Sequence, residues 1–170
     1  RADDRSTPSA GGARLVRRAD LSVHRLGASP GQRVDDDDPP DTLKTFLASS
    51  PGRNELVRHE ARLAGLTSLT EILESGRPRV VNDLAIFREG RHLHTRILEK
   101  EGFRSSYTVP MFLDGSFWGF IFFNSRSTGS FSEAALATLD VYAHLISAVV
   151  TAEMLAVRVL AAAVKSAHDM

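Results

Sequence analysis

Few residues of this chain have the types and spacing that chemistry requires. His168 and Asp169 form a His-Asp dipeptide, which could suggest a metal-dependent phosphodiesterase. A metal site needs three or four converging ligands, and one dipeptide does not supply them. His92 and His94 could chelate a metal on an extended strand, but no third ligand lies near them. We therefore expect no metal and no cofactor.

Nucleophilic catalysis is also poorly supported. A serine nucleophile needs a base and an orienting acid, and Ser105 and Ser106 stand before an expected strand without a nucleophile elbow. The 170 residues include no cysteine, which excludes disulfides, cysteine nucleophiles, thiolate metal sites and thioether-attached chromophores in this chain. We expect a domain that is not an enzyme.

The composition favours a single soluble domain. Lys plus Arg and Asp plus Glu both number 21, so the chain lacks the basic surplus typical of nucleic-acid binding. No apolar run approaches the ~20 residues of a membrane span. We expect a cytoplasmic protein that binds neither nucleic acid nor membrane. Residues 1–14 have the composition of a flexible tail, and Asp35–Asp38 that of a solvated loop.

The segment Tyr107–Ser125, YTVPMFLDGSFWGFIFFNS, predicts a β-hairpin that turns at Asp114-Gly115. Strict alternation gives it two apolar faces. One face is expected to carry Val109, Met111, Leu113, Phe117, Gly119, Ile121 and Phe123. The other is expected to carry Thr108, Pro110, Phe112, Trp118, Phe120, Phe122 and Asn124. A hairpin of this kind must be covered on both sides. Gly119 indicates a close backbone approach within the sheet.

Further elements are expected on both sides of this hairpin. Apolar alternation predicts strands at 20–26, 42–49 and 79–81. A capping box at Ser68 and Glu71 predicts the start of a short helix that stops before Gly76. A second short helix is expected at 94–101, with Gly102 as its stop. Ser132 is the expected N-cap of a helix that continues to about Asp169.

This last helix would be ~55 Å long at ~1.5 Å per residue, because it contains neither glycine nor proline. Its first part carries a core stripe: Leu136, Leu139, Ala143, Ile146 and Val150. A second stripe steps by three and four residues, as in a coiled-coil seam. Its members are Leu145, Ala148, Ala152, Leu155, Val159 and Ala162. We expect a homodimer through this stripe, although it could instead be one side of an intramolecular bundle.

These elements predict an α+β fold with a central antiparallel sheet. Helices would cover one face and a crossover with short helices the other. The motifs GFRSSYTVPMFLDGSFWGFIFFNS, FSEAALATLDVYAHLISAVV and SLTEILESGRPRVVNDL resemble, in this order, the hairpin, closing helix and pocket wall of GAF domains. The resemblance covers about Leu21 to Val150. It implies a sensor domain at 15–150 followed by a signalling helix at 151–170.

The resemblance has a narrower form. PRVVNDL, SSYTVP, GFIFFNS and AAAVKSAHDM are similar to the GAF region upstream of HD-type (HD-GYP-like) phosphodiesterase domains in bacterial cyclic-di-GMP signalling proteins. Such an effector domain would lie beyond Met170 in the same polypeptide. The chain departs from the family at its start, where the usual first helix of the terminal bundle is replaced by a Gly- and Arg-rich segment.

The resemblance also implies a small-molecule pocket on the second face of the sheet. Its expected residues are Asn82, Asp83, His94, Arg104, Ser105, Tyr107, Phe112, Phe120, Phe122 and Asn124. Two functions remain open. The module could sense an unidentified small molecule or a partner and relay that state through the long helix. Alternatively, crossover helices could fill this face, leaving a ligand-free dimerisation module.

Overall fold

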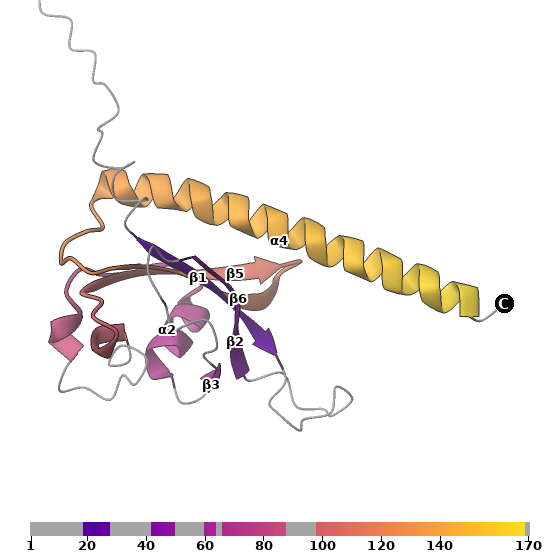
Figure 1. Ribbon diagram of the computed structural model, residues 1–170, viewed down its shortest axis with the longest axis horizontal. Coiled ribbons are helices and arrows are strands. Elements are labelled where there is room, and N and C mark those ends of the chain that lie inside the picture. The colour runs from indigo at the N-terminus through magenta and orange to yellow at the C-terminus, as the bar shows by residue number, and fades with distance from the viewer. Residues whose placement is uncertain (1–18, 28–41, 50–59, 64–65, 88–97, 169–170) are drawn as a thin grey trace, which may run out of the picture.

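Six antiparallel strands form one sheet in the computed structural model, which describes residues 19–27, 42–49, 60–63, 66–87 and 98–168 (Figure 1). The spatial order is β3-β2-β1-β6-β5-β4. The bounds are β1 Asp20–Gly27, β2 Thr42–Ser49, β3 Glu60–Arg62, β4 Arg79–Val81, β5 Ser105–Leu113 and β6 Ser116–Ser125. The strands expected at 20–26, 42–49 and 79–81 are confirmed.

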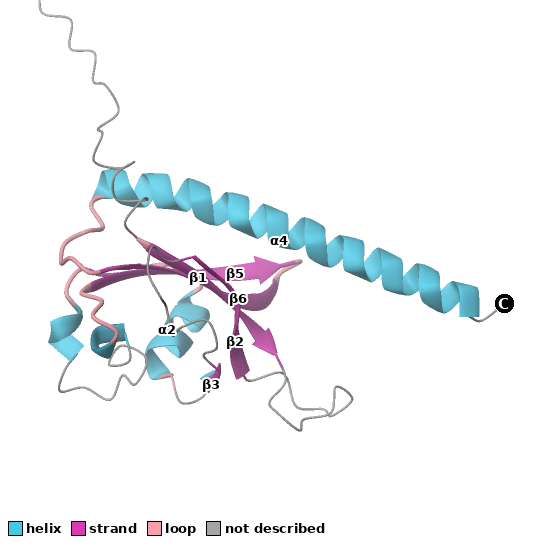
Figure 2. Ribbon diagram, in the orientation of Figure 1, coloured by secondary structure: helices cyan, strands magenta, loops and turns pink. Residues whose placement is uncertain are grey.

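Helices lie on both faces of this sheet, as Figure 2 shows by its colouring. The long helix α4, Glu133–His168, crosses one face and continues past the edge of the sheet. On the other face lie α2, Thr67–Ser75, and the short 3-10 helix η3, Leu84–Phe87. The expected α+β fold with a long C-terminal helix is therefore confirmed.

The α4 face of the sheet holds the main core, here called the α4 cluster. Its buried members are Val23, Tyr107, Met111, Leu113, Ile121, Phe123, Phe131, Leu139, Ala143 and Val150. Leu136, Ile146 and Met154 pack against it from α4, which confirms the expected core stripe. Since apolar burial is the main driving force for packing, this stripe fixes α4 on the sheet.

The opposite face carries two separate apolar clusters. The α2 cluster consists of Leu43, Leu66, Leu69, Ile72, Phe120 and Phe122. The η3 cluster consists of Val81, Leu84, Leu98 and Phe103, with Phe87 packed against it. This face thus carries two apolar clusters, and the polar side chains near them determine whether it can bind a ligand.

A β-bulge divides the hairpin faces differently from strict alternation. Met111 pairs with Gly119 while Phe112 pairs with Phe117, so Trp118 is one residue too many on β6. As a result Trp118 packs against the α4 cluster and Phe117 against the α2 cluster. The sequence-based assignment of Phe117 and Trp118 to faces was wrong, because alternation reverses across an extra residue.

The turn between these strands has the expected conformation. Asp114 and Gly115 both have positive φ, 51° and 78°, as a type I′ hairpin turn requires. Deeper in β6, a Cβ added to Gly119 would lie 2.0 Å from the His24 carbonyl oxygen. The expected close backbone approach at Gly119 is confirmed, and it is what allows β6 to lie against β1.

The two predicted helix caps had different outcomes. The Ser132 hydroxyl accepts a hydrogen bond from the Ala135 backbone N–H at 3.4 Å, which confirms it as the N-cap of α4. The capping box at Ser68 was wrong, because α2 begins at Thr67 with Leu66 as its N-cap and no side-chain cap. Ser68 is therefore inside the helix, on the buried side of α2.

Gly102 ends a helical turn as expected. The Gly102 N–H donates to the Glu99 carbonyl and the Phe103 N–H to the Leu98 carbonyl, at 2.9 and 3.0 Å. With φ at 83°, Gly102 forms a Schellman-type C-cap. The expected start of this helix at His94, the tail at 1–14 and Asp35–Asp38 lie outside the described residues.

By length and composition alone, α4 could cross a membrane, with a mean hydropathy of 1.9 over its most apolar window. The sequence-based statement that no apolar run approaches this length is thereby corrected. Only 6% of that window is buried within the domain, whereas the first half of the helix packs on the sheet through Leu139, Ala143 and Val150. One such helix is weak evidence for a membrane span.

Candidate functional site

A strip of buried polar side chains crosses the sheet on the face that carries the α2 and η3 clusters. Its members on the sheet are Ser22 and His24 on β1, Asn124 on β6, and Ser106 and Thr108 on β5. The strand registers place Ser106 opposite Asn124, and both Ser22 and Thr108 opposite Phe122. Buried polar side chains are costly unless they have partners, so their concentration in one strip needs an explanation.

Part of the strip is satisfied internally. The Ser106 hydroxyl donates to Asn124 Oδ1 at 2.8 Å, and His24 Nε2 lies 3.2 Å from Ser22 Oγ. The His24 ring also packs edge-on against Phe122, with ring centroids 5.0 Å apart. These contacts hold the polar side chains in fixed positions beside the apolar floor. The strip is thus an ordered surface.

Two polar atoms that border the strip are not satisfied. Ser68 Oγ, on the buried side of α2, and Arg79 Nε, on β4, are both buried without a hydrogen-bond partner. Arg79 pairs with Thr108 across the strands, and it lies on the same face as Val81 because the two are two residues apart. An unpaired buried donor usually costs about 1–3 kcal/mol. Arg79 Nε thus lies unsatisfied on the β4 side of the sheet, and Ser68 Oγ in the helix layer that covers the same face.

The charge environment of Arg79 has two opposing parts. Burial lowers the pKa of the guanidinium, and the nearby Glu71 carboxylate on α2 raises it. A third unsatisfied buried atom, Asp20 Oδ2, lies on β1 opposite Asn124, 4.0 Å from Arg126. Glu71 lies one turn beyond Ser68 on α2, and α2 contacts β5, the strand next to β4.

The aromatic floor expected for the pocket is largely covered. Phe120 and Phe122 are fully buried against Leu66, Leu69 and Ile72. Phe112 is different, because it is 41% exposed and touches Phe117 near the hairpin turn, with ring centroids 5.8 Å apart. Under α2 the aromatic face is core, as the ligand-free alternative expected, and the polar strip beside it is the part that could receive a ligand.

Tyr107 and Ser105 do not share a face with Phe120. Tyr107 belongs to the α4 cluster, and its hydroxyl donates to the Asp140 carboxylate. The buried Ser105 hydroxyl donates to the Ser127 carbonyl at 2.7 Å. Residues 105 and 107 alternate with 106 and 108 on β5, so they point toward α4. They cannot contribute side chains to a pocket that contains Phe120.

The expected polar rim is only partly assembled. Asp83 is exposed and accepts a hydrogen bond from the Ala85 N–H at 2.9 Å, which caps η3. Asn82 is also exposed, and its carbonyl accepts from the Gly129 N–H at 2.8 Å. Arg104 forms an ion pair with Glu99 at 3.7 Å. His94 lies outside the described residues. Of the predicted residues, Asn124 alone is a member of the polar strip.

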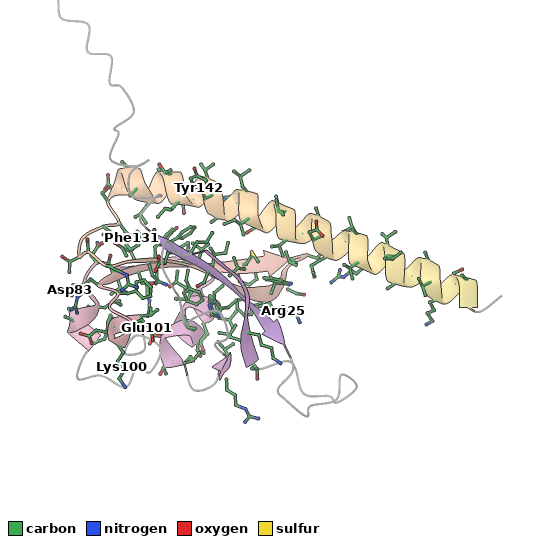
Figure 3. All side chains as sticks on the ribbon, viewed as in Figure 1. Arg25, Asp83, Lys100, Glu101, Phe131 and Tyr142 are labelled. Atoms are coloured by element: carbon green, nitrogen blue, oxygen red, sulfur yellow. The ribbon has the colours of Figure 1, made fainter. Side chains whose placement is uncertain are left out.

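The predicted dimerisation residues form one exposed stripe on α4. It comprises Leu145, Ala148, Ala152, Leu155, Val159 and Ala162. By helical periodicity this stripe lies opposite the residues of α4 that pack on the sheet, Leu139, Ala143 and Val150. Figure 3 labels Tyr142, another exposed residue of this helix. Leu155 and Val159 are 60% and 62% exposed, which is unusual for large aliphatic side chains. An apolar stripe of this length is typical of a helix that packs against another helix.

Sequence reasoning missed most of the polar strip. Ser68 was interpreted as a cap, and Arg79 as part of a strand with no further role. A period-two reading of β1 could have placed Ser22 and His24 on one face, next to the predicted floor. Nothing local in the sequence could have shown that Arg79 is partly buried, with its Nε shielded from water. In the part of the chain that the structure describes, no group of three His, Asp or Glu side chains could hold a metal ion.

The fold and this arrangement agree with one family. The family model of the GAF domain matches residues 18–150. The chain belongs to the GAF domain family. No curated protein matches the sequence. GAF domains are in general regulatory and non-catalytic.

Solved GAF structures show the same fold at low sequence identity. A phycocyanobilin-bound GAF domain from a cyanobacterial phytochrome is 15% identical, with a TM-score of 0.62 over 82% of this chain and 78% of that one. The GAF domain of a two-component sensor histidine kinase from Bacillus halodurans is 12% identical, with a TM-score of 0.61 over 89% and 99%. A GAF domain/HD domain protein from Geobacter sulfurreducens is 15% identical, with a TM-score of 0.58 over 85% and 86%.

Proposed function

We propose that this GAF domain is a sensory module that binds a small molecule at the polar strip, beside the core that α2 covers. The observation that carries the proposal is the pair of buried, unsatisfied atoms beside this strip, Ser68 Oγ and Arg79 Nε. Ligand sites combine apolar walls with a few converging polar groups, and the two apolar clusters flank the strip in this way. A bound ligand would satisfy both atoms and remove their cost.

A relay to α4 would run through the sheet. Thr108 borders the candidate site, and its neighbour Tyr107 contacts Asp140 of α4 on the opposite face. A ligand that shifts β5 would therefore act on the hydrogen bond that ties the sheet to the helix. Such a ligand changes the helix position only if it binds one arrangement more tightly than the other.

A thermal-shift experiment on the folded domain distinguishes a ligand-binding sensor from a ligand-free dimerisation module. A panel of nucleotides, cyclic nucleotides, aromatic acids and small metabolites is added, and the unfolding midpoint is measured. Binding at 100 times Kd adds about 2.7 kcal/mol, a shift of several degrees for a domain of this size. A shift that Thr108→Val abolishes supports the site. No shift with any compound would favour the ligand-free alternative.

Dimerisation through α4 is a second proposal, and it holds for either function. It is supported by the six exposed residues of the predicted stripe, which covers about three heptads. A second copy of this chain would bury Leu155 and Val159 on both helices at once, as a two-fold interface does. The module would then have a dimeric output helix.

The proposed effector is an HD-type phosphodiesterase domain in cyclic-di-GMP signalling, as the sequence resemblance implies. One solved neighbour is described as a GAF domain/HD domain protein, which supports the HD-type domain. A cytoplasmic location is supported by the absence of cysteine in this chain. The coding sequence beyond Met170 tests the effector, and a kinase or cyclase domain there would overturn the phosphodiesterase assignment. Cell fractionation tests the location.

A further inference from the structure

We propose that the ligand of this domain carries an oxyanion, a carboxylate or a phosphate, which Arg79 and Ser68 bind together. This inference rests on the proposed function, since it names the chemistry of the group bound at the same site. Both residues are donors whose buried atoms have no hydrogen-bond partner in the described structure. Two unsatisfied donors call for an acceptor, and one of them carries a positive charge.

The register of β4 defines the position of Arg79. Val80 packs toward the α4 cluster, whereas Val81 is a member of the η3 cluster. Arg79 therefore lies on the face of Val81, two residues away, and opposite Thr108. The guanidinium is held at the edge of the polar strip, with its Nε–H turned away from water. An arginine placed at random on an edge strand would extend into solvent.

Ser68 approaches the strip from the other layer. Its side chain is 1% exposed, on the side of α2 that also buries Leu69 and Ile72. A serine inside a helix commonly donates to the carbonyl four residues earlier, as Thr70 does to Leu66 at 3.4 Å. Ser68 makes no such bond in the described structure. Its hydroxyl is available to a ligand that lies between α2 and the sheet.

The electrostatics favour an anion over a neutral acceptor. Arginine remains protonated in proteins, so partial burial leaves a poorly solvated cation rather than a neutral side chain. Glu71 is the acidic group that acts on it, and water screens this attraction because the Glu71 side chain is exposed. A buried oxyanion would supply the compensation directly, and guanidinium groups bind carboxylate and phosphate in the same geometry.

Matched pairs of probes test this inference. Cyclic GMP is compared with guanosine, and indole-3-acetate with indole-3-acetamide, so that each pair differs in the anionic group. Affinities are measured by calorimetry for the wild type, Arg79→Gln and Ser68→Ala. Arg77→Gln is the matched control, because Arg77 is exposed two residues earlier and its loss changes the net charge equally. The pair that binds also tells phosphate from carboxylate.

We expect an anionic probe to bind at least tenfold more tightly than its neutral partner. Arg79→Gln should lose at least tenfold in affinity for that probe, Ser68→Ala about threefold to tenfold, and Arg77→Gln less than twofold. These values correspond to charge-assisted and neutral hydrogen bonds. If both members of a pair bound equally and Arg79→Gln did not change their affinity, the oxyanion proposal would be wrong. The proposed ligand site would still stand. No binding by any probe would overturn both.

A second measurement separates a binding role of Arg79 from a structural one. Without ligand, Arg79→Met removes a buried cation that has no hydrogen-bond partner at Nε, so its unfolding midpoint should equal or exceed that of the wild type. If Arg79 instead stabilised the fold through Glu71, Arg79→Met would lower the midpoint. That outcome would overturn the assignment even if the variant also lost affinity.

Discussion

The Tyr107 hydroxyl on β5 donates a hydrogen bond to the Asp140 carboxylate on α4. The Tyr107 ring is buried in the α4 cluster, nearly parallel to Phe123 with centroids 5.9 Å apart, and it also contacts Phe131. One side chain thus joins the centre of the sheet to the long helix by both packing and a charged hydrogen bond. It is also the residue next to Thr108, which borders the polar strip.

Replacing Tyr107 by Phe should lower the free energy of unfolding by about 1–2 kcal/mol, because it removes a hydrogen bond to a charged group and keeps the ring. A double-mutant cycle with Asp140→Asn, measured by urea denaturation, isolates the coupling between the two side chains. Additive effects of the two substitutions would contradict the bond. Tyr142→Phe is the matched control, since Tyr142 lies on the exposed side of the same helix.

The same pair predicts a loss of stability at high pH. Burial, and next the hydrogen bond to the Asp140 carboxylate, raises the pKa of Tyr107 above its ordinary value near 10. The unfolded chain therefore releases this proton first as the pH rises. The contribution is fully present below about pH 10 and is lost above it, at up to about 1.4 kcal/mol per pH unit. Denaturation of the wild type and Tyr107→Phe between pH 8 and 11 should show a steeper decline for the wild type.

Gly119→Ala should be strongly destabilising, by about 3 kcal/mol or more, because the new Cβ would lie 2.0 Å from the His24 carbonyl oxygen. Backbone cannot move aside as a flexible side chain can, so β1 and β6 would have to separate. Thermal unfolding followed by circular dichroism measures the effect. Ser116→Ala, an exposed change in the same strand, should be nearly neutral. A Gly119→Ala variant as stable as the wild type would refute the close approach.

The contact between the hairpin turn and α4 should matter little. Arg158 Nη1 lies 3.4 Å from Asp114 Oδ2, and these side chains are 71% and 80% exposed. Exposed ion pairs contribute about 0.2–1 kcal/mol. Arg158→Ala should therefore change the unfolding free energy by less than about 1 kcal/mol, and high salt should remove the difference. A larger loss of unfolding free energy would mean that the Asp114–Arg158 contact contributes substantially to holding α4 on the domain, in contradiction to this prediction.

The apolar stripe on α4 predicts self-association. Leu155→Asp combined with Val159→Asp should give a monomer that remains folded, because neither side chain belongs to a core cluster. Sedimentation velocity measures the change. Val157→Asp combined with Leu160→Asp is the control: these residues are equally exposed but lie off the heptad stripe, so the dimer should persist. A monomeric wild type would refute the dimer.

Much of this fold follows from local patterns. Turn chemistry identified Asp114-Gly115, and the long segment without glycine or proline identified α4. Those features depend on neighbours in sequence. The bulge at Trp118 does not, because an extra residue leaves the composition of a strand unchanged while it reverses every later side chain. The interpretation of the hairpin was therefore right about its existence and wrong about two of its residues.

The candidate site was less accessible to the same reasoning. The unsatisfied state of Ser68 and Arg79 is a property of burial, which strands and helices distant in sequence create together. Sequence placed Ser68 at a cap because serine is common there. The aromatic residues were easier to predict, and Phe120 and Phe122 do lie on the second face. They are its packed floor, and among the polar side chains of the strip beside them only Asn124 was predicted.

Because α4 is one uninterrupted helix, a small tilt where it packs on the sheet is amplified at its far end. Met154 is the last residue of the helix that packs against the α4 cluster, and the helix extends to His168. At ~1.5 Å per residue, ~21 Å of helix lies beyond Met154. A tilt of about 10° at the sheet would displace the far end sideways by roughly 4 Å, about two-thirds of the ~5.4 Å helical pitch. A rearrangement too small to disturb the core could thus move the far end of the helix by several times more than the residues on the sheet.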